Sequence, residues 1–94
     1  MRRIRWAEIA SSDLESVSDY LREHHPSYRQ PTIQKLYAAA RSLKKYPNRG
    51  RIGLKEGTRE LFIAPLPYII VYAVEPEMVH ILRVIHTSQE WPSV

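Results

Sequence analysis

The chain opens with alternating basic and apolar residues and then changes to a helical pattern. Residues 3–7 predict a short strand. Ser12 and Glu15 match a capping box, in which two side chains satisfy free backbone N–H groups at a helix start, so we expect a helix to begin near Ser11. Apolar residues then recur at helical spacing at Leu14, Val17 and Leu21. This helix should end near Pro26, because the residue before a proline avoids helical geometry.

A second helix is predicted to begin near Pro31, since proline fits the first helical turn. One apolar stripe follows at Ile33, Leu36, Tyr37, Ala40 and Leu43. Lys44 and Lys45 close the helix, where cations suit the negative end of its dipole. Residues 47–50, Pro-Asn-Arg-Gly, predict a turn.

After Gly50 the pattern is that of strands. The predicted strands cover residues 51–55, 58–64, 68–74 and 79–85, separated by a break at 65–67 and a hairpin turn at 75–77. Residues 68–74 are nearly all apolar, which is typical of a central strand buried on both faces. The chain is therefore predicted to be α+β, with a helical hairpin on one face of a twisted, mainly antiparallel sheet of about four to five strands. The other face should be partly open.

Composition limits the class of protein. With 94 residues the chain makes one domain, residues 1–94, with a modest core. It has no cysteine, which excludes disulfides and thiolate metal sites and fits a cytoplasmic protein. No apolar run reaches signal-peptide or membrane-helix length, so no membrane association is expected. The four histidines have no metal-ligand spacing, and neither a metal nor a cofactor is predicted.

The positive charge is concentrated in the middle of the chain. The net charge is +4, and residues 24–59 hold nine basic residues and a single acid, Glu56. The basic residues are Arg29, Lys35, Arg41, Lys44, Lys45, Arg49, Arg51, Lys55 and Arg59. Such a run is often only a solvated face. Here it crosses a helix end and a loop, which favours a positive surface for a polyanionic or acidic partner.

An arginine in an apolar strand is the first candidate for function. Alternation places Arg83 on one face with Val79, Ile81 and Ile85. Either it pairs with an acid such as Glu60, or it points across the open face of the sheet. Tyr68 and Tyr72 share a strand face, and together with Arg59 and Arg83 they would form a surface that binds phosphate and stacks on bases. Four other large aromatic residues are interpreted as packing residues: Trp6, Tyr20, Tyr28 and Tyr46.

Several segments together resemble the RelE/ParE toxin superfamily, over essentially the whole chain. They include Trp6-Ala7, Asp13-Leu14, the Leu43…Pro47…Gly50-Arg51 stretch, residues 57–61, residues 67–72, residues 81–86 and Gln89-Glu90-Trp91-Pro92. The resemblance implies a toxin of a type II toxin–antitoxin system with the fold predicted above. RelE-like members cleave mRNA on the ribosome without a metal, whereas ParE-like members poison DNA gyrase. Both are neutralised by a co-expressed antitoxin, which also carries the complex to operator DNA.

The resemblance also implies roles for individual residues. In the RNA-cleaving interpretation, Arg59 and Arg83 stabilise phosphate, His86 acts as general acid or base, and Tyr68 completes the catalytic set. Substrate contacts would come from Lys44, Lys45, Arg49, Arg51, Lys55 and Tyr72. RNA cleavage is favoured slightly; the alternatives are gyrase inhibition and a degenerate toxin that only binds its antitoxin. Strict alternation puts Arg83 and His86 on opposite faces, so they cooperate only if the strand ends or bulges between them. The ending at residues 89–92 is closer to ParE-like tails.

Overall fold

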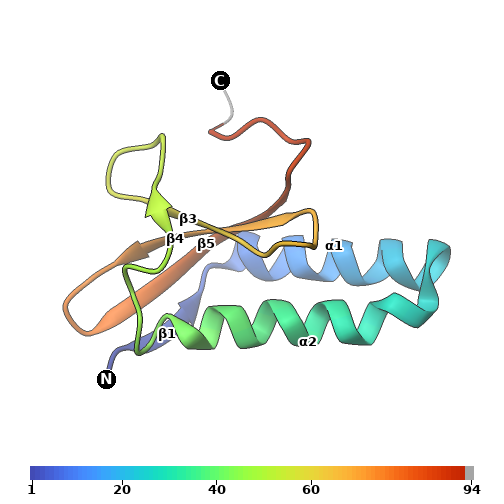
Figure 1. The fold of residues 1–94 in the computed structure, drawn as a ribbon, viewed down its shortest axis with the longest axis horizontal. Helices are drawn as coiled ribbons and strands as arrows, with labels where there is room; N and C mark the ends of the chain where they lie inside the picture. The colour runs from blue at the N-terminus through green and yellow to red at the C-terminus, as the bar shows by residue number, and fades with distance from the viewer. Residues whose placement is uncertain (93–94) are drawn as a thin grey trace.

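The computed structural model describes residues 1–92, which fold into a helical hairpin on one face of a five-stranded sheet (Figure 1). β1 (Arg3–Trp6) leads into α1 (Glu8–His24), and a single residue separates α1 from α2 (Pro26–Ser42). The two helices run antiparallel, and their connection projects beyond the edge of the sheet. Within the described residues, neither helix is both long and apolar enough to cross a membrane.

The start of α1 differs from the prediction. The helix begins at Glu8, because Ala7 is extended (φ −63°, ψ 150°) and its carbonyl already accepts the Ser11 N–H at 3.0 Å. No side chain caps this end, so the capping box predicted at Ser12 and Glu15 is wrong, and both residues lie exposed within the helix. The predicted end near Pro26 is confirmed, since α1 stops at His24.

α2 begins five residues earlier than predicted. Pro26 takes the first turn, where its missing N–H costs nothing, and Pro31 lies inside the helix. The sequence offered two prolines with the same helix-start signal, and the first one is used. The predicted stripe is confirmed at Leu36, Ala40 and Leu43, which are all buried, whereas Tyr37 is 43% exposed.

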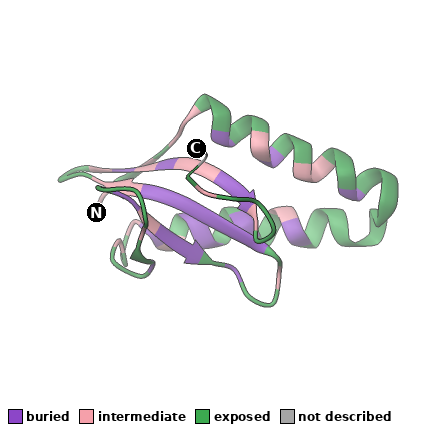
Figure 2. Cartoon of the chain, turned by 90° about the horizontal axis from the view of Figure 1, so that it is seen from above, coloured by how far each residue is buried: buried purple, intermediate pink, exposed green. Residues whose placement is uncertain are grey.

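The strands lie in the order β1-β5-β4-β3-β2. β2 (Arg51–Ile52) and β3 (Arg59–Phe62) are shorter than predicted, while β4 (Tyr68–Val74) has the predicted bounds and β5 spans Met78–His86. All pairs are antiparallel except β1 with β5, which are parallel. β4 is the middle strand and its first five residues are buried, which confirms the central strand (Figure 2).

A bulge in β5 changes which residues face the helices. Val71 pairs with Arg83 and Tyr72 pairs with Ile81, so Leu82 is the extra residue. The predicted alternation therefore breaks at Leu82: Val79 and Ile81 lie on the helix side, while Arg83 and Ile85 lie on the open side.

The helix side of the sheet holds the main core. There the sheet contributes Leu61, Ile63, Tyr68, Ile70, Tyr72, Val79, Ile81 and Val84, and the helices contribute Ala10, Leu14, Leu36, Ala39, Ala40 and Leu43. The open side has only a small cluster of Ile69, Val71 and Ile85, on which Trp91 packs after the chain turns back from β5. The open face is therefore partly covered by the chain's own end.

Candidate functional site

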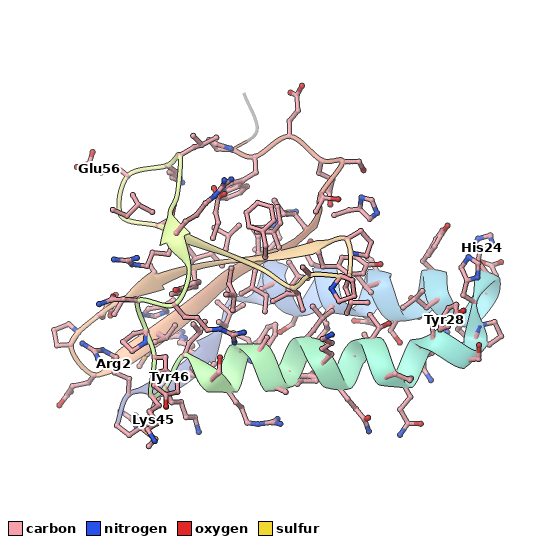
Figure 3. The ribbon with its side chains drawn as sticks, viewed as in Figure 1. Arg2, His24, Tyr28, Lys45, Tyr46 and Glu56 are labelled. Carbon is pink, nitrogen blue, oxygen red and sulfur yellow. The ribbon has the colours of Figure 1, made fainter. Side chains whose placement is uncertain are left out.

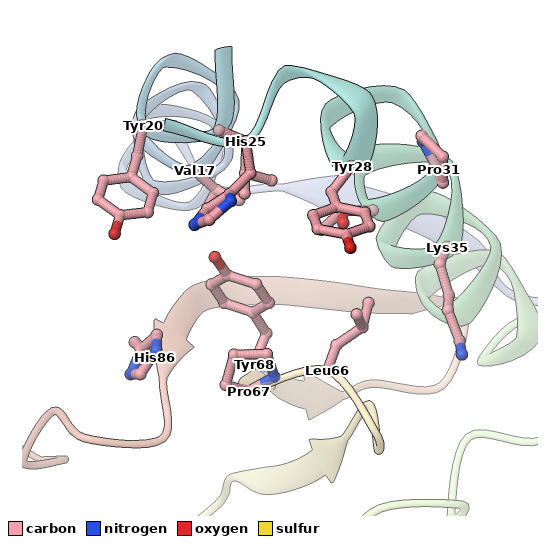
Figure 4. Close-up of a pocket in the computed structure, with 12 residues that line it drawn as sticks. Val17, Tyr20, His25, Tyr28, Pro31, Lys35, Leu66, Pro67, Tyr68 and His86 are labelled. Carbon is pink, nitrogen blue, oxygen red and sulfur yellow. The ribbon is translucent and has the colours of Figure 1, made fainter. Parts of the chain in front are cut away.

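A groove of about 780 Å³ separates the helical hairpin from the end of the sheet (Figure 4). Its helical wall carries Val17, Tyr20, Leu21, His25, Tyr28, Pro31, Thr32 and Lys35, and its opposite wall carries Leu66, Pro67, Tyr68 and His86. The walls are mostly apolar, and among residues 1–92 no carboxylate lines them. Such a groove suits apolar side chains with few polar or anionic groups.

Tyr68 and His86 meet at this groove because β4 and β5 pair them directly. Their rings contact edge to face, with centroids 5.6 Å apart. Burial, reinforced by the nearby Tyr20 hydroxyl, raises the pKa of Tyr68 above its ordinary value. Tyr68 is therefore a neutral hydrogen-bond donor, and Figure 4 shows its hydroxyl directed towards the helices.

The turn after β5 orients His86. The backbone N–H of Ser88 donates to His86 Nδ1 at 3.0 Å, and the Ser88 hydroxyl lies 2.7 Å from the same nitrogen. A backbone N–H can only donate, so Nδ1 is the acceptor and a neutral imidazole carries its proton on Nε2. The Gln89 side chain holds the same turn by accepting the His86 N–H at 2.7 Å.

Arg59 holds the loop between α2 and β2 by a hydrogen bond to its backbone. Its guanidinium donates to the carbonyl oxygen of Gly50 at 2.8 Å. Beside it, the Tyr72 hydroxyl donates to the Pro47 carbonyl at 2.7 Å and accepts the Gly50 N–H at 2.8 Å. Tyr72 is fully buried, so the prediction of a substrate contact for it is wrong: its polar atom is used inside the protein.

Arg83 is paired with an acid, but not with the one suggested by the sequence. Its Nε and Nη2 donate to the two oxygens of Asp13 on α1 at 2.7 and 3.1 Å. Glu60 instead binds Arg51, at 2.8 Å from Nη2, and accepts the Leu54 N–H. The Asp13 hydrogen bonds are the main cause of the raised pKa of Arg83. Both partners are largely buried, which is typical of a structural ion pair.

The predicted phosphate-binding surface is therefore not formed. Tyr68, Tyr72 and Arg59 lie on the helix side of the sheet, whereas Arg83 lies on the other side. The bulge at Leu82 precedes Arg83, so it does not bring His86 to the face of Arg83. Of the predicted catalytic set, only Tyr68 and His86 are brought together.

The cations predicted to bind substrate lie between the end of α2 and the start of β3. Lys45, Arg49, Arg51 and Lys55 are exposed and Lys44 is half-buried. Arg51 is also stacked over the Phe62 ring at 4.5 Å. The interpretation of Tyr20, Tyr28 and Tyr46 as packing residues is wrong, since each is more than half exposed, whereas Trp6 does pack, against Tyr37. Within residues 1–92, no three His, Cys, Asp or Glu side chains cluster as metal ligands.

Sequence reasoning missed the groove itself. Tyr20, Tyr28 and Lys35 come from two helices and His25 is the residue between them, while Leu66 lies in a predicted break between strands, and no local pattern relates these segments to one another. One signal was present: Tyr20 and Tyr28 fall outside the apolar stripes of their helices. Aromatic residues outside a buried stripe indicate a contact surface.

A family model and a known relative both indicate a toxin. The family model for the ParE toxin of the type II toxin–antitoxin system parDE matches residues 4–91. The toxin RelE2 of Caulobacter vibrioides is 37% identical over 89 residues, covering 95% of this chain and 99% of that protein.

Two solved structures have a similar fold. The chromosomal ParDE toxin–antitoxin system of P. aeruginosa superposes with a TM-score of 0.79 at 22% identity, covering 92% of this chain and 96% of that one. The E. coli DinJ-YafQ complex gives a TM-score of 0.63 at 14% identity, with 94% and 96% coverage. At these identities the likeness to the two structures is one of fold alone.

Proposed function

The chain belongs to the ParE toxin family within the RelE/ParE superfamily, and we propose that it arrests growth by binding DNA gyrase rather than by cutting RNA. It is the toxin of a type II toxin–antitoxin module, and the proposal concerns its target. The observation that carries this proposal is the separation of Arg59 from Arg83. Each guanidinium has an internal acceptor, and the two lie on opposite faces of the sheet.

RNA cleavage places a stricter demand on geometry than binding does. An acid, a base and cations for the developing phosphorane charge must surround one phosphate. Moving Arg83 to the groove would break its two hydrogen bonds to Asp13 and leave that carboxylate unpaired. A protein that acts by occupying its target needs no such convergence, and this chain's mostly apolar groove fits that simpler requirement.

RNA cleavage is the second candidate, and the Tyr68–His86 pair favours it. The two side chains meet at the groove, His86 is oriented by Ser88, and Lys35 lines the same groove. Nε2 of His86 would serve as the acid or base and Lys35 as the cation. This candidate does not use Arg59 or Arg83.

The cognate antitoxin is the partner for which we propose the groove. The similar solved folds include toxin–antitoxin complexes. The groove presents exposed Tyr20 and Tyr28 rings, and its described lining holds Lys35 but no acid, so it suits an apolar segment with an acidic residue. Leu66→Asp should weaken antitoxin binding at least tenfold by placing an unpaired charge there. The same change at exposed Leu54, outside the groove, should not alter binding.

The decisive experiment measures both targets. The chain is induced in cells without its antitoxin, with primer extension on a translated message and a supercoiling assay with purified gyrase. Inhibited supercoiling with intact message is expected. Cut message with normal supercoiling would transfer the proposal to the second candidate. Normal growth with soluble, folded chain contradicts both and leaves a degenerate toxin.

One pair of variants separates the candidates independently. His86→Gln should leave gyrase inhibition unchanged, whereas an RNA-cleaving site would lose about 10²–10⁴ in rate with its acid or base. His24→Gln is the matched control, because His24 is exposed at the end of α1 and contacts the groove residue Tyr20 without lining the groove itself.

A further inference from the structure

Cations from two distant parts of the chain gather at one end of the molecule, which we call the basic pole: Arg2, Arg3, Lys44, Lys45 and Arg49. Arg2 precedes β1 and Arg3 begins it, and the other three follow α2. A hollow of about 530 Å³ is lined jointly by Met1, Arg2, Arg3, Lys44, Pro76 and Glu77. Figure 3 shows Arg2 and Lys45 at this end, with His24 and Tyr28 at the opposite one.

The charges of the basic pole are not neutralised within the described residues. Three ion pairs within residues 1–92 use Asp13, Asp19 and Glu60, and a fourth contact, between His80 and Glu75, is ionic only when His80 is protonated; none of the four includes a basic-pole side chain. Arg2 donates to the Glu75 carbonyl and Arg49 to the Ser42 hydroxyl, both uncharged acceptors. Two acids lie nearby: Glu77 lines the hollow, and Glu75 is the residue whose carbonyl accepts from Arg2. Five cations therefore share one surface with two acids, and this excess concentrates a positive potential there.

An exposed aromatic ring lies among these cations. Tyr46 is 56% exposed, and the ammonium of Lys45 lies 5.6 Å from its ring centroid. A second hollow, of about 600 Å³, is lined by Lys45, Tyr46, Pro47, Asn48 and Arg49. Cations beside an exposed aromatic ring are what the binding of single-stranded nucleic acid requires. The cations attract the phosphates, and an unpaired base can stack on the ring.

We propose that the basic pole binds the phosphate backbone of single-stranded nucleic acid, with one base stacked on Tyr46. An acidic protein segment would use the charges but not the exposed ring, so the ring favours nucleic acid. The site lies away from the groove, and a ligand there leaves the groove accessible to an antitoxin. The proposal goes beyond the toxin's choice of target and holds for either candidate.

The test uses the purified full-length chain and a fluorescein-labelled oligothymidine of about 20 nucleotides, which has no 2′-OH to be cut. Anisotropy is measured over a series of salt concentrations for wild type, Lys44→Gln/Lys45→Gln and Tyr46→Ala. The control, Arg22→Gln/Arg29→Gln, removes the same charge from the helical hairpin. Each lost phosphate contact reduces the slope of log K against log salt by about 0.7 on a single strand.

The expected results are specific to the pole. The double lysine variant should lower the slope by about 1.4, and the control should keep the wild-type slope. Tyr46→Ala should weaken binding roughly tenfold with an unchanged slope. Equal losses in the pole and control variants would reduce the effect to net charge and overturn the proposal. Preference for duplex DNA would overturn the single-stranded assignment, and displacement only by polyglutamate would assign the surface to an acidic protein.

Discussion

Asp13 on α1 binds both Nε and Nη2 of Arg83 on β5, at 2.7 and 3.1 Å. The same carboxylate accepts the backbone N–H of Val84 at 3.0 Å. β1 ends at Trp6, opposite Ile81, so further along that side β5 has no strand neighbour in the part of the chain that the structure describes. Asp13 therefore takes the place of a strand partner and joins the helical hairpin to the sheet.

Replacement of Arg83 should destabilise the fold. Arg83→Ala leaves a largely buried carboxylate without its partner, which typically costs about 3–5 kcal/mol. Urea unfolding should show the loss directly, and any loss of toxicity should follow from it. Arg22→Ala is the control: its ion pair with Asp19 is more than half exposed on both sides, and its loss should cost at most about 1 kcal/mol. Lost toxicity with unchanged unfolding would instead restore a functional role for Arg83.

Tyr72→Phe should destabilise the protein because it removes one buried hydroxyl oxygen. The ring still fills the core, but the hydroxyl no longer joins the Pro47 carbonyl to the Gly50 N–H. The buried Gly50 amide is left without a partner, at a cost of roughly 1–3 kcal/mol. Hydrogen exchange of the Gly50 amide should accelerate with the loss. An unchanged exchange rate would contradict this account.

Stability should fall in alkali, and Tyr72 should account for part of the fall. Burial raises the pKa of Tyr72 above its ordinary value of about 10, with opposing effects from Gly50, Arg59 and Arg49. Above about pH 10 the unfolded chain loses the phenol proton while the folded protein keeps it, so the free energy of unfolding decreases as pH rises. Below that pH the contribution is constant. Tyr72→Phe should show a shallower decrease, and Tyr68, whose pKa is also raised, should retain its own part.

Gly50→Ala should disturb the same loop by crowding. A Cβ there would lie 2.8 Å from the Tyr72 hydroxyl and 2.9 Å from the Glu60 carbonyl oxygen. Overpacking of this kind costs roughly 1–3 kcal/mol. Combined with Tyr72→Phe the loss should be smaller than the sum, because the nearest clashing atom is gone. Simple additivity in thermal melting would show that the two residues do not meet as described.

Most of the sheet was predictable because its signals are local. An apolar run such as Tyr68–Val74 favours burial whatever the rest of the fold is, and the sequence Glu75-Pro76-Glu77 favours a turn. Helix starts were less predictable, since Pro26 and Pro31 carry the same local signal and only the packing of α2 beside α1 decides between them. The capping box failed for a similar reason: Ala7 is held by its N–H bond to the Ile81 carbonyl, so the helix can begin before Ser12.

The candidate site was less predictable than the fold. Strict alternation assigns each side chain of β5 to one face of the sheet. The single extra residue, Leu82, moves Arg83 to the face opposite to the predicted one. The partner of Arg83 is Asp13, 70 residues away in the chain, a distance over which no spacing rule operates. Tyr68 and His86 could be placed together only once the β4–β5 register was known.

The parallel pairing of β1 with β5 determines when the protein can become active during its synthesis. Ile4 is made long before its partner on the neighbouring strand, Val79, because most of the domain lies between them in the chain. Until β5 emerges, β1 has no strand neighbour and the hairpin lacks Val79, Ile81 and Val84 to pack upon. Such long-range pairing slows folding, and a domain of this size folds as one cooperative unit. A chain interrupted before Met78 would therefore lack both the neighbour of β1 and this part of the core, so an incomplete chain should have no folded toxin domain to be neutralised.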